Sequence, residues 1–139
     1  MFESWKEKRA EKKAKDKAIR ESQYWKTNAL LQDCLQSMRG SCTLAPVEMH
    51  EAAIAAVNIA MQENSWTAAE AVPDDFFTGQ IFLVWDDEKL PVLTAPGALA
   101  EHCLSDLRAV ADQTFLLSQS LERIVWFRRD GQIMLYSIA

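Results

Sequence analysis

The chain has 139 residues, of which 49% are hydrophobic, and a net charge of −5. These values predict a single domain with a true hydrophobic core. Three cysteines without paired spacing exclude a disulfide framework, and no apolar stretch is long enough to span a bilayer. Met1 is followed by charged residues rather than by a signal peptide, so we expect a cytoplasmic protein with no membrane contact.

The charge is unevenly distributed. Residues 1–20 contain eight Lys and Arg against four Asp and Glu, a net charge of +4, whereas the rest of the chain has a net charge of −9. An acidic body argues against nucleic acid as its partner and permits a basic or cationic partner.

Residues 2–39 contain neither Gly nor Pro and predict one long helix that stops at Gly40. Its first part has only a thin stripe of alanines on a charged background, so residues 1–20 are expected to form an exposed, basic helical arm. A solvated helix end is favoured for this arm over a surface that binds nucleic acid or membrane. The domain proper is expected to comprise residues 21–139, with an apolar helix face formed by Tyr24, Leu31, Leu35 and Met38.

The middle of the chain predicts a second helix from Pro46 to about Glu63, with Thr43 or Ser41 as a possible cap. Residues 65–75 are ambiguous, and a short helix ended by Pro73 is one interpretation. The apolar run within residues 76–85 predicts a buried strand. A turn then leads to a returning strand over residues 90–94, which Pro91 places at the edge of a sheet.

A third helix is predicted over residues 98–111 and a strand over residues 114–120. The strongest signal is the final hairpin, in which two β-prone runs meet at Asp130-Gly131, a dipeptide suited to a two-residue primed turn. This turn would pair Phe127 with Met134, Trp126 with Leu135, and Val125 with Tyr136. Both faces of the hairpin are apolar, so at least part of it should be covered on both sides.

These elements have the order ααββαβββ. They predict an α+β domain with a largely antiparallel sheet, helices packed on that sheet and a long N-terminal helix.

The motifs of common active sites are missing from the sequence. It has no glycine-rich phosphate loop, and its two histidines and three cysteines do not have zinc-site spacing. His50 is expected at a helix boundary. His102 and Cys103 are adjacent on a helix, so their side chains should not face each other. We therefore expect no enzyme activity, no cofactor and no metal.

Acidic residues cluster in the predicted turns. Such residues usually serve solubility, but they also form docking surfaces for cationic partners. The candidate partner-binding residues are Asp74, Asp75, Asp86, Asp87, Glu88 and Glu122. Arg128 and Arg129 beside the last turn are expected to protect the hairpin tip against aggregation; contact with an anionic partner is the alternative.

The succession over residues 76–139 resembles small bacterial immunity proteins of contact-dependent growth inhibition and related polymorphic toxin systems. It consists of residues 81–85, residues 91–94, a helix, residues 115–120, and the hairpin of residues 125–136. The resemblance implies a cytoplasmic protein that binds a cognate toxin domain, for example a nuclease, and neutralises it stoichiometrically. It assigns no individual residue.

Two rival functions belong to other classes. One is an acidic adaptor or secretion chaperone, for which a tight dimer would be expected. The other is a nucleic-acid-associated protein that uses Lys6–Arg20, whose binding would fall steeply with salt. The sequence leaves the oligomeric state open.

Overall fold

A computed structural model describes residue 36 and residues 41–87 and 90–138. The helix expected over residues 2–39, the arm of residues 1–20 and the domain boundary after it therefore lie outside the described residues, apart from the helical Gln36. The elements in chain order are β1 (Thr43–Leu44), α4 (Val47–Glu63), β2 (Thr67–Ala69), the 3-10 helix η1 (Asp74–Phe77), β3 (Gln80–Trp85), β4 (Leu93–Pro96), α5 (Gly97–His102), α6 (Leu104–Ala109), β5 (Thr114–Ser118), β6 (Arg123–Phe127) and β7 (Ile133–Ser137).

One seven-stranded sheet organises the described chain. Its strand order is β1-β4-β3-β5-β6-β7-β2, and every neighbouring pair is antiparallel. The prediction of an α+β fold with a largely antiparallel sheet is confirmed. The predicted order of elements is not confirmed, because it omits the two outermost strands, β1 and β2.

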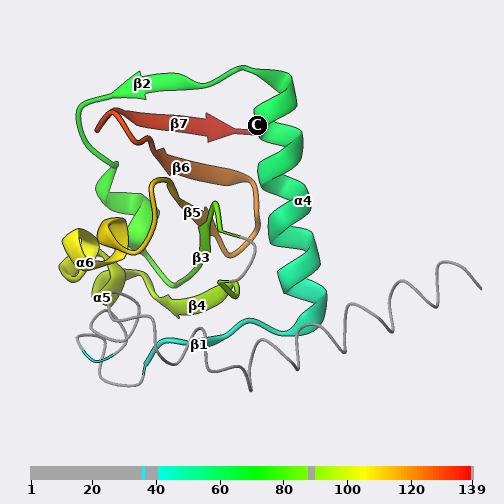
Figure 1. Cartoon of the computed structure of the whole chain (residues 1–139), viewed down its shortest axis with the longest axis vertical. Helices are drawn as coiled ribbons and strands as arrows, with labels where there is room; N and C mark the ends of the chain where they lie inside the picture. The colour runs from blue at the N-terminus through cyan, green and yellow to red at the C-terminus, as the bar shows by residue number, and fades with distance from the viewer. Residues whose placement is uncertain (1–35, 37–40, 88–89, 139) are drawn as a thin grey trace, which may run out of the picture.

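Different helices pack on the two faces of the sheet (Figure 1). Helix α4 lies on one face, and η1, α5 and α6 lie on the other. Alternate residues of the central strands enter the two cores, as the period of a β-strand requires. Leu116 in β5 is buried on the side of α5 and α6, and Leu117 is buried on the side of α4. This two-sided burial agrees with the continuous apolar run of β3, from Ile81 to Trp85, which is buried throughout.

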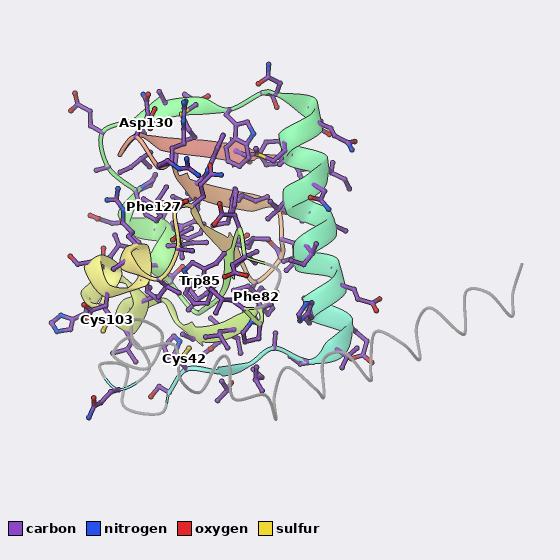
Figure 2. All side chains as sticks on the ribbon, in the orientation of Figure 1. Cys42, Phe82, Trp85, Cys103, Phe127 and Asp130 are labelled. Atoms are coloured by element: carbon purple, nitrogen blue, oxygen red, sulfur yellow. The ribbon has the colours of Figure 1, made fainter. Side chains whose placement is uncertain are left out.

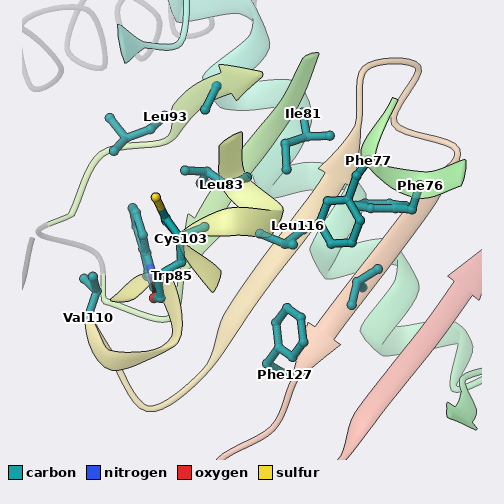
Figure 3. Packing of buried hydrophobic residues seen from close by; sticks show 14 of the residues in the cluster. Phe76, Phe77, Ile81, Leu83, Trp85, Leu93, Cys103, Val110, Leu116 and Phe127 are labelled. Carbon is teal, nitrogen blue, oxygen red and sulfur yellow. Dashed lines mark hydrogen bonds between the residues drawn. The ribbon is translucent and has the colours of Figure 1, made fainter. Parts of the chain in front are cut away.

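The core between the sheet and α5–α6 is rich in aromatic residues (Figure 3). Phe76 and Phe77 of η1 make an edge-to-face contact, with ring centroids 5.6 Å apart. The indole nitrogen of Trp85 donates a hydrogen bond of 3.0 Å to the carbonyl of Leu107, so this buried polar group is satisfied. The contact ties the end of β3 to α6.

Helix α4 packs through small residues. Ala53, Val57 and Ala60 recur at three- and four-residue steps and are all buried, which lets the helix lie close to the strands. The helix follows Pro46, which occupies the cap position without a side-chain cap, contrary to the expectation that Thr43 or Ser41 would cap it. Asn64 ends the helix in the left-handed conformation with φ 52°, and its amide donates to the carbonyl of Ala60.

Asn64 supplies a test of this helix end. We expect Asn64→Ala to lower the free energy of unfolding by about 1 kcal/mol, because a Cβ-bearing residue without a local polar side chain is disfavoured at positive φ. Asn64→Gly should keep the stability of the parent protein. The same Asn→Ala change at the exposed mid-helix residue Asn58 should instead be neutral or slightly stabilising, because alanine is the better helix former. Urea denaturation of the three variants measures these differences, and a loss at Asn58 equal to that at Asn64 would contradict the role of the helix end.

Residues 65–75, for which a short helix was one interpretation, contain a strand instead. Thr67, Ala68 and Ala69 pair with Leu135, Met134 and Ile133 of β7 and form the edge strand β2. The open edge of β7 offers backbone hydrogen bonds to the same three residues.

The returning strand is also displaced. It was expected over residues 90–94 at the sheet edge, but β4 comprises Leu93–Pro96 and has β1 on its outer side, with Thr43 paired to Thr94. Pro91 lies before the strand, so its missing N–H does not interrupt the ladder. Pro91 therefore does not mark β4 as an edge strand, because it lies outside that strand.

The third helix is divided into α5 and α6 at Cys103, which has φ −101° and ψ 19°. Cys103, Leu107 and Val110 are all buried against the sheet, so one apolar stripe continues across the break. The sequence has neither Gly nor Pro at this position, so it provides no local signal for the break.

The final hairpin forms where predicted, but its register is one residue away from the prediction. Phe127 pairs with Ile133, and Val125 pairs with Leu135. Gly131 has φ 89°, whereas Asp130 has no positive φ, so the two-residue primed turn is not formed. A three-residue loop takes its place, closed by hydrogen bonds from Gly131 N to Arg128 O (3.0 Å) and from Arg128 N to Gln132 O (2.9 Å).

The shift of one residue exchanges the faces of β7. Tyr136 lies in the core under α4 together with Ile124 and close to Trp126, and not with Phe127 and Val125 as predicted. The expectation that both faces of the hairpin are covered is confirmed, because Phe127 and Ile124 are buried on opposite sides.

Candidate partner-binding surface

The acidic residues selected from the sequence lie in two separate groups. Asp74 and Asp75 begin η1, ahead of β3, whereas Asp86 and Asp87 follow directly after β3. A strand of this length spans ~17–20 Å, so the groups are at opposite ends of the sheet. Glu122 belongs to the first group because its neighbour Arg123 binds Asp75, and Glu88 lies outside the described residues. The fold does not form one acidic patch from these residues.

The first group contains an ion pair. Arg123 donates hydrogen bonds of 3.1 and 3.4 Å to the two carboxylate oxygens of Asp75, and its guanidinium lies 5.5 Å from the ring centroid of Phe76. Beside this pair is a groove of about 360 Å³ whose lining includes Val125 and Leu135. The Asp75 charge is partly neutralised here, which weakens this group as a contact for a cationic partner.

The second group is part of a hydrogen-bonded chain. Asp86 accepts hydrogen bonds from the backbone N–H and the side-chain amide of Gln113, both at 3.3 Å. The carbonyl oxygen of the Gln113 side chain accepts a 2.8 Å hydrogen bond from the indole nitrogen of Trp126. The carboxylate, the amide and the indole are thereby held in one orientation. We call this arrangement the Asp86–Gln113–Trp126 chain.

Trp126 is also held by aromatic neighbours. It stacks on Phe115 with centroids 5.8 Å apart and meets Trp66 edge-on at 5.3 Å. Trp66 in turn contacts the ring of Tyr136, whose hydroxyl donates a 2.5 Å hydrogen bond to Glu63 at the end of α4. That hydrogen bond raises the pKa of Tyr136, with burial as a second cause. This cluster fixes the Trp126 ring between the sheet and the surface.

Trp126 lines a surface hollow of about 410 Å³. Its lining consists of Gln113, Trp126, Arg128, Arg129 and Asp130, and we call it the Trp126 hollow. The guanidinium of Arg128 lies 5.4 Å from the Trp126 ring centroid and pairs with Asp130 at 3.0 Å. Tryptophan and arginine in a partly desolvated hollow are the residue types that dominate binding energy at protein interfaces.

The sequence identified Asp86, Asp87, Arg128 and Arg129 as charged residues of turns, but it did not connect them. Gln113 and Trp126 were missed as site residues. Asp86 and Gln113 are 27 positions apart, and they meet only because Trp85 pairs with Thr114 in the sheet. The available signal was a polar residue directly before a buried strand, and its partner could be found only with the strand pairing.

The other reactive side chains have ordinary surroundings. Cys103 is buried, and its thiol pKa is raised by that burial and, to a lesser extent, by the charge of Asp106. Its neighbour His102 is exposed, and His50 is half-buried in α4. In the part of the chain that the structure describes, no group of three or more His, Cys, Asp or Glu side chains is placed to hold a metal ion.

No family model matches the sequence, and a search of curated proteins finds no match. Among residues 41–87 and 90–138, no helix has the length and apolar character needed to cross a membrane.

Proposed function

We propose that the protein is a cytoplasmic immunity protein, which binds a cognate bacterial toxin domain and neutralises it by stoichiometric binding. The observation that supports this most is the Asp86–Gln113–Trp126 chain beside the Trp126 hollow. It combines a rigid aromatic anchor with carboxylates in one exposed place, and such pre-organised anchors lose little entropy on binding.

The charge of the segment from residue 41 to residue 88 suits a basic partner. Residues 41–88 contain nine Asp and Glu and no Lys or Arg, and this segment includes Asp86 and Asp87. A toxin that cleaves nucleic acid binds a polyanion and therefore has a basic cleft. An acidic turn that enters such a cleft would exclude the substrate and would accelerate association electrostatically.

The partner is tested first by isolation and then by toxicity. The full chain, tagged, is incubated with a nuclease-treated lysate of its native cells, and a protein retained in a 1:1 ratio is identified by mass spectrometry. The retained domain is then expressed in a sensitive host with and without the chain. Protection that requires complex formation supports the proposal, and a partner that is harmless when expressed alone contradicts it.

The binding surface around Asp86 is tested by making the same charge reversal at each end of β3 in turn. We expect Asp86→Lys to weaken the complex by about 30-fold, as the loss of a ~2 kcal/mol hot spot would. Asp75→Lys is the matched control, because it changes the net charge equally and also removes an intramolecular contact. It should weaken the complex by no more than about threefold, through long-range charge alone.

Isothermal titration calorimetry at two salt concentrations measures both variants, after circular dichroism has shown that each is folded. Equal losses for the two variants would mean that only net charge matters, and would remove the surface around Asp86 from the interface.

A further inference from the structure

We propose a second site, in which Arg108, Arg128 and Arg129 bind a small oxyanion, either a phosphate or a carboxylate group, in a hollow between α6 and the β6–β7 hairpin. Arg128 and Arg129 also line the Trp126 hollow, but Arg108 lines only this second hollow. The proposal does not depend on the proposed function, because it is centred on Arg108 and is tested on the isolated protein.

The arginines are concentrated at this place. The described residues contain four arginines and no lysine, and three of the four line the same hollow, which has a volume of about 310 Å³. They come from two distant segments, since Arg108 is in the last turn of α6 and the other two adjoin the hairpin loop. Figure 2 marks Asp130 at the tip of this hairpin and Phe127 further along it toward α6. The fold therefore brings together three of the four arginines that the structure describes.

Arg108 is the central residue of the proposed site. Its guanidinium carbon lies 4.6 Å from the ring centroid of Phe127, a buried residue of β6. No ion pair of Arg108 with a carboxylate occurs among the described residues. Stacking occupies the face of a guanidinium and leaves its N–H groups, which lie in its plane, available for an anion. The Phe127 ring thus positions the Arg108 guanidinium and leaves its N–H groups able to bind an anion.

The other two arginines already bind carboxylates at the rim. Arg129 pairs with Asp112 at 2.9 Å and Arg128 pairs with Asp130 at 3.0 Å. Both pairs are exposed, with at least 39% of each side chain accessible, so solvent screens them and they exchange readily. An incoming oxyanion can share these guanidinium groups or displace the carboxylates, because an arginine fork matches either group geometrically.

The size of the hollow suits a small anionic group. The hollow is also lined by Ser105, Asp112 and Gly131, and a Cβ added to Gly131 would meet nothing within 4 Å, so the loop leaves the entrance open. Its volume is at the lower end of the range for ligand sites, which favours a single anionic group over a whole nucleotide.

The experiment is an NMR titration of the isotopically labelled full chain. Inorganic phosphate and sodium acetate are added in separate series, and sodium chloride at equal ionic strength is the reference. The signals followed are the arginine Nε–H groups and the backbone amide of Gly131. We expect saturable shifts at Arg108, Arg129 and Gly131. Saturation with phosphate alone assigns a phosphate site, saturation with acetate alone assigns a carboxylate site, and saturation with both assigns a general oxyanion site.

The variants separate this site from general charge effects. Arg108→Gln should weaken binding by about tenfold, the loss expected for one charge-assisted hydrogen bond. Arg123→Gln is the matched control at the other end of the sheet and should leave the affinity within about twofold. Asp112→Asn should tighten binding by up to about fivefold, because it frees Arg129. Shifts that equal those with chloride, or equal losses in Arg108→Gln and Arg123→Gln, would overturn the proposal.

Discussion

Replacing Gly97 with alanine is expected to lower the free energy of unfolding by about 3 kcal/mol, near the upper end of what overpacking costs. Gly97 begins α5, and its amide donates a 2.7 Å hydrogen bond to the carbonyl of Gly79. A Cβ at this position would lie 2.3 Å from the backbone oxygen of Phe77 and 3.0 Å from that of Gly79. Backbone atoms cannot rotate away as a side chain would, so the start of α5 or η1 would have to move.

Gly131→Ala is the control that separates a steric clash from backbone conformation. At Gly131 the added Cβ has open space, and the cost comes from the positive φ alone, about 1–2 kcal/mol. Denaturant unfolding of the two variants gives both losses. If Gly97→Ala were no more destabilising than Gly131→Ala, the close approach of α5 to η1 and to the start of β3 would be contradicted.

Truncation of the two neighbouring leucines of β5 should show that both faces of the sheet are covered. Leu116 and Leu117 are both fully buried, but Leu116 packs under α5 and α6 and Leu117 packs under α4. We expect Leu116→Ala and Leu117→Ala each to cost about 3–4 kcal/mol, because each removes a buried side chain and leaves a cavity.

The half-buried Leu104 of α6 provides the comparison, with an expected loss of about 1 kcal/mol for Leu104→Ala. Thermal or urea unfolding measures all three variants. A small loss at Leu117 together with a large loss at Leu116 would mean that α4 does not close its face of the sheet. A large loss at both positions supports the two-layer cover of Figure 1.

Local patterns in the sequence determined the most regular elements. The sequence predicts a helix from Pro46 to about Glu63, and the structure has α4 at Val47–Glu63, with Ala53 and Val57 buried. The unbroken apolar run from Ile81 to Trp85 predicts a strand buried on both faces, and the structure agrees. These predictions succeed because burial of a helix stripe or a strand face depends on residues close together in the chain.

The sequence also indicated the α+β class, the antiparallel hairpins and the position of the last turn. The register of that hairpin was decided by the backbone of its loop. Asp-Gly permits a two-residue turn, but the chain adopts a three-residue loop in which only Gly131 has a positive φ, and Asp130 accepts a hydrogen bond from the amide of Gln132 at 3.0 Å. Both loops suit the same residues, so local chemistry could not select between them.

Only the tertiary structure decided the edge strands and the surfaces. Thr67–Ala69 becomes a strand because the edge of β7 lies beside it, and the helix breaks at Cys103 without a local breaker in the sequence. The acidic residues separate into two groups because β3 lies between them, and Asp86 meets Gln113 because β3 pairs with β5. Arg108 joins Arg128 and Arg129 in the same way, across the packing of α6 on the hairpin. Contacts between distant segments depend on strand order and helix placement, and those follow from the burial of the whole core rather than from any one stretch of sequence.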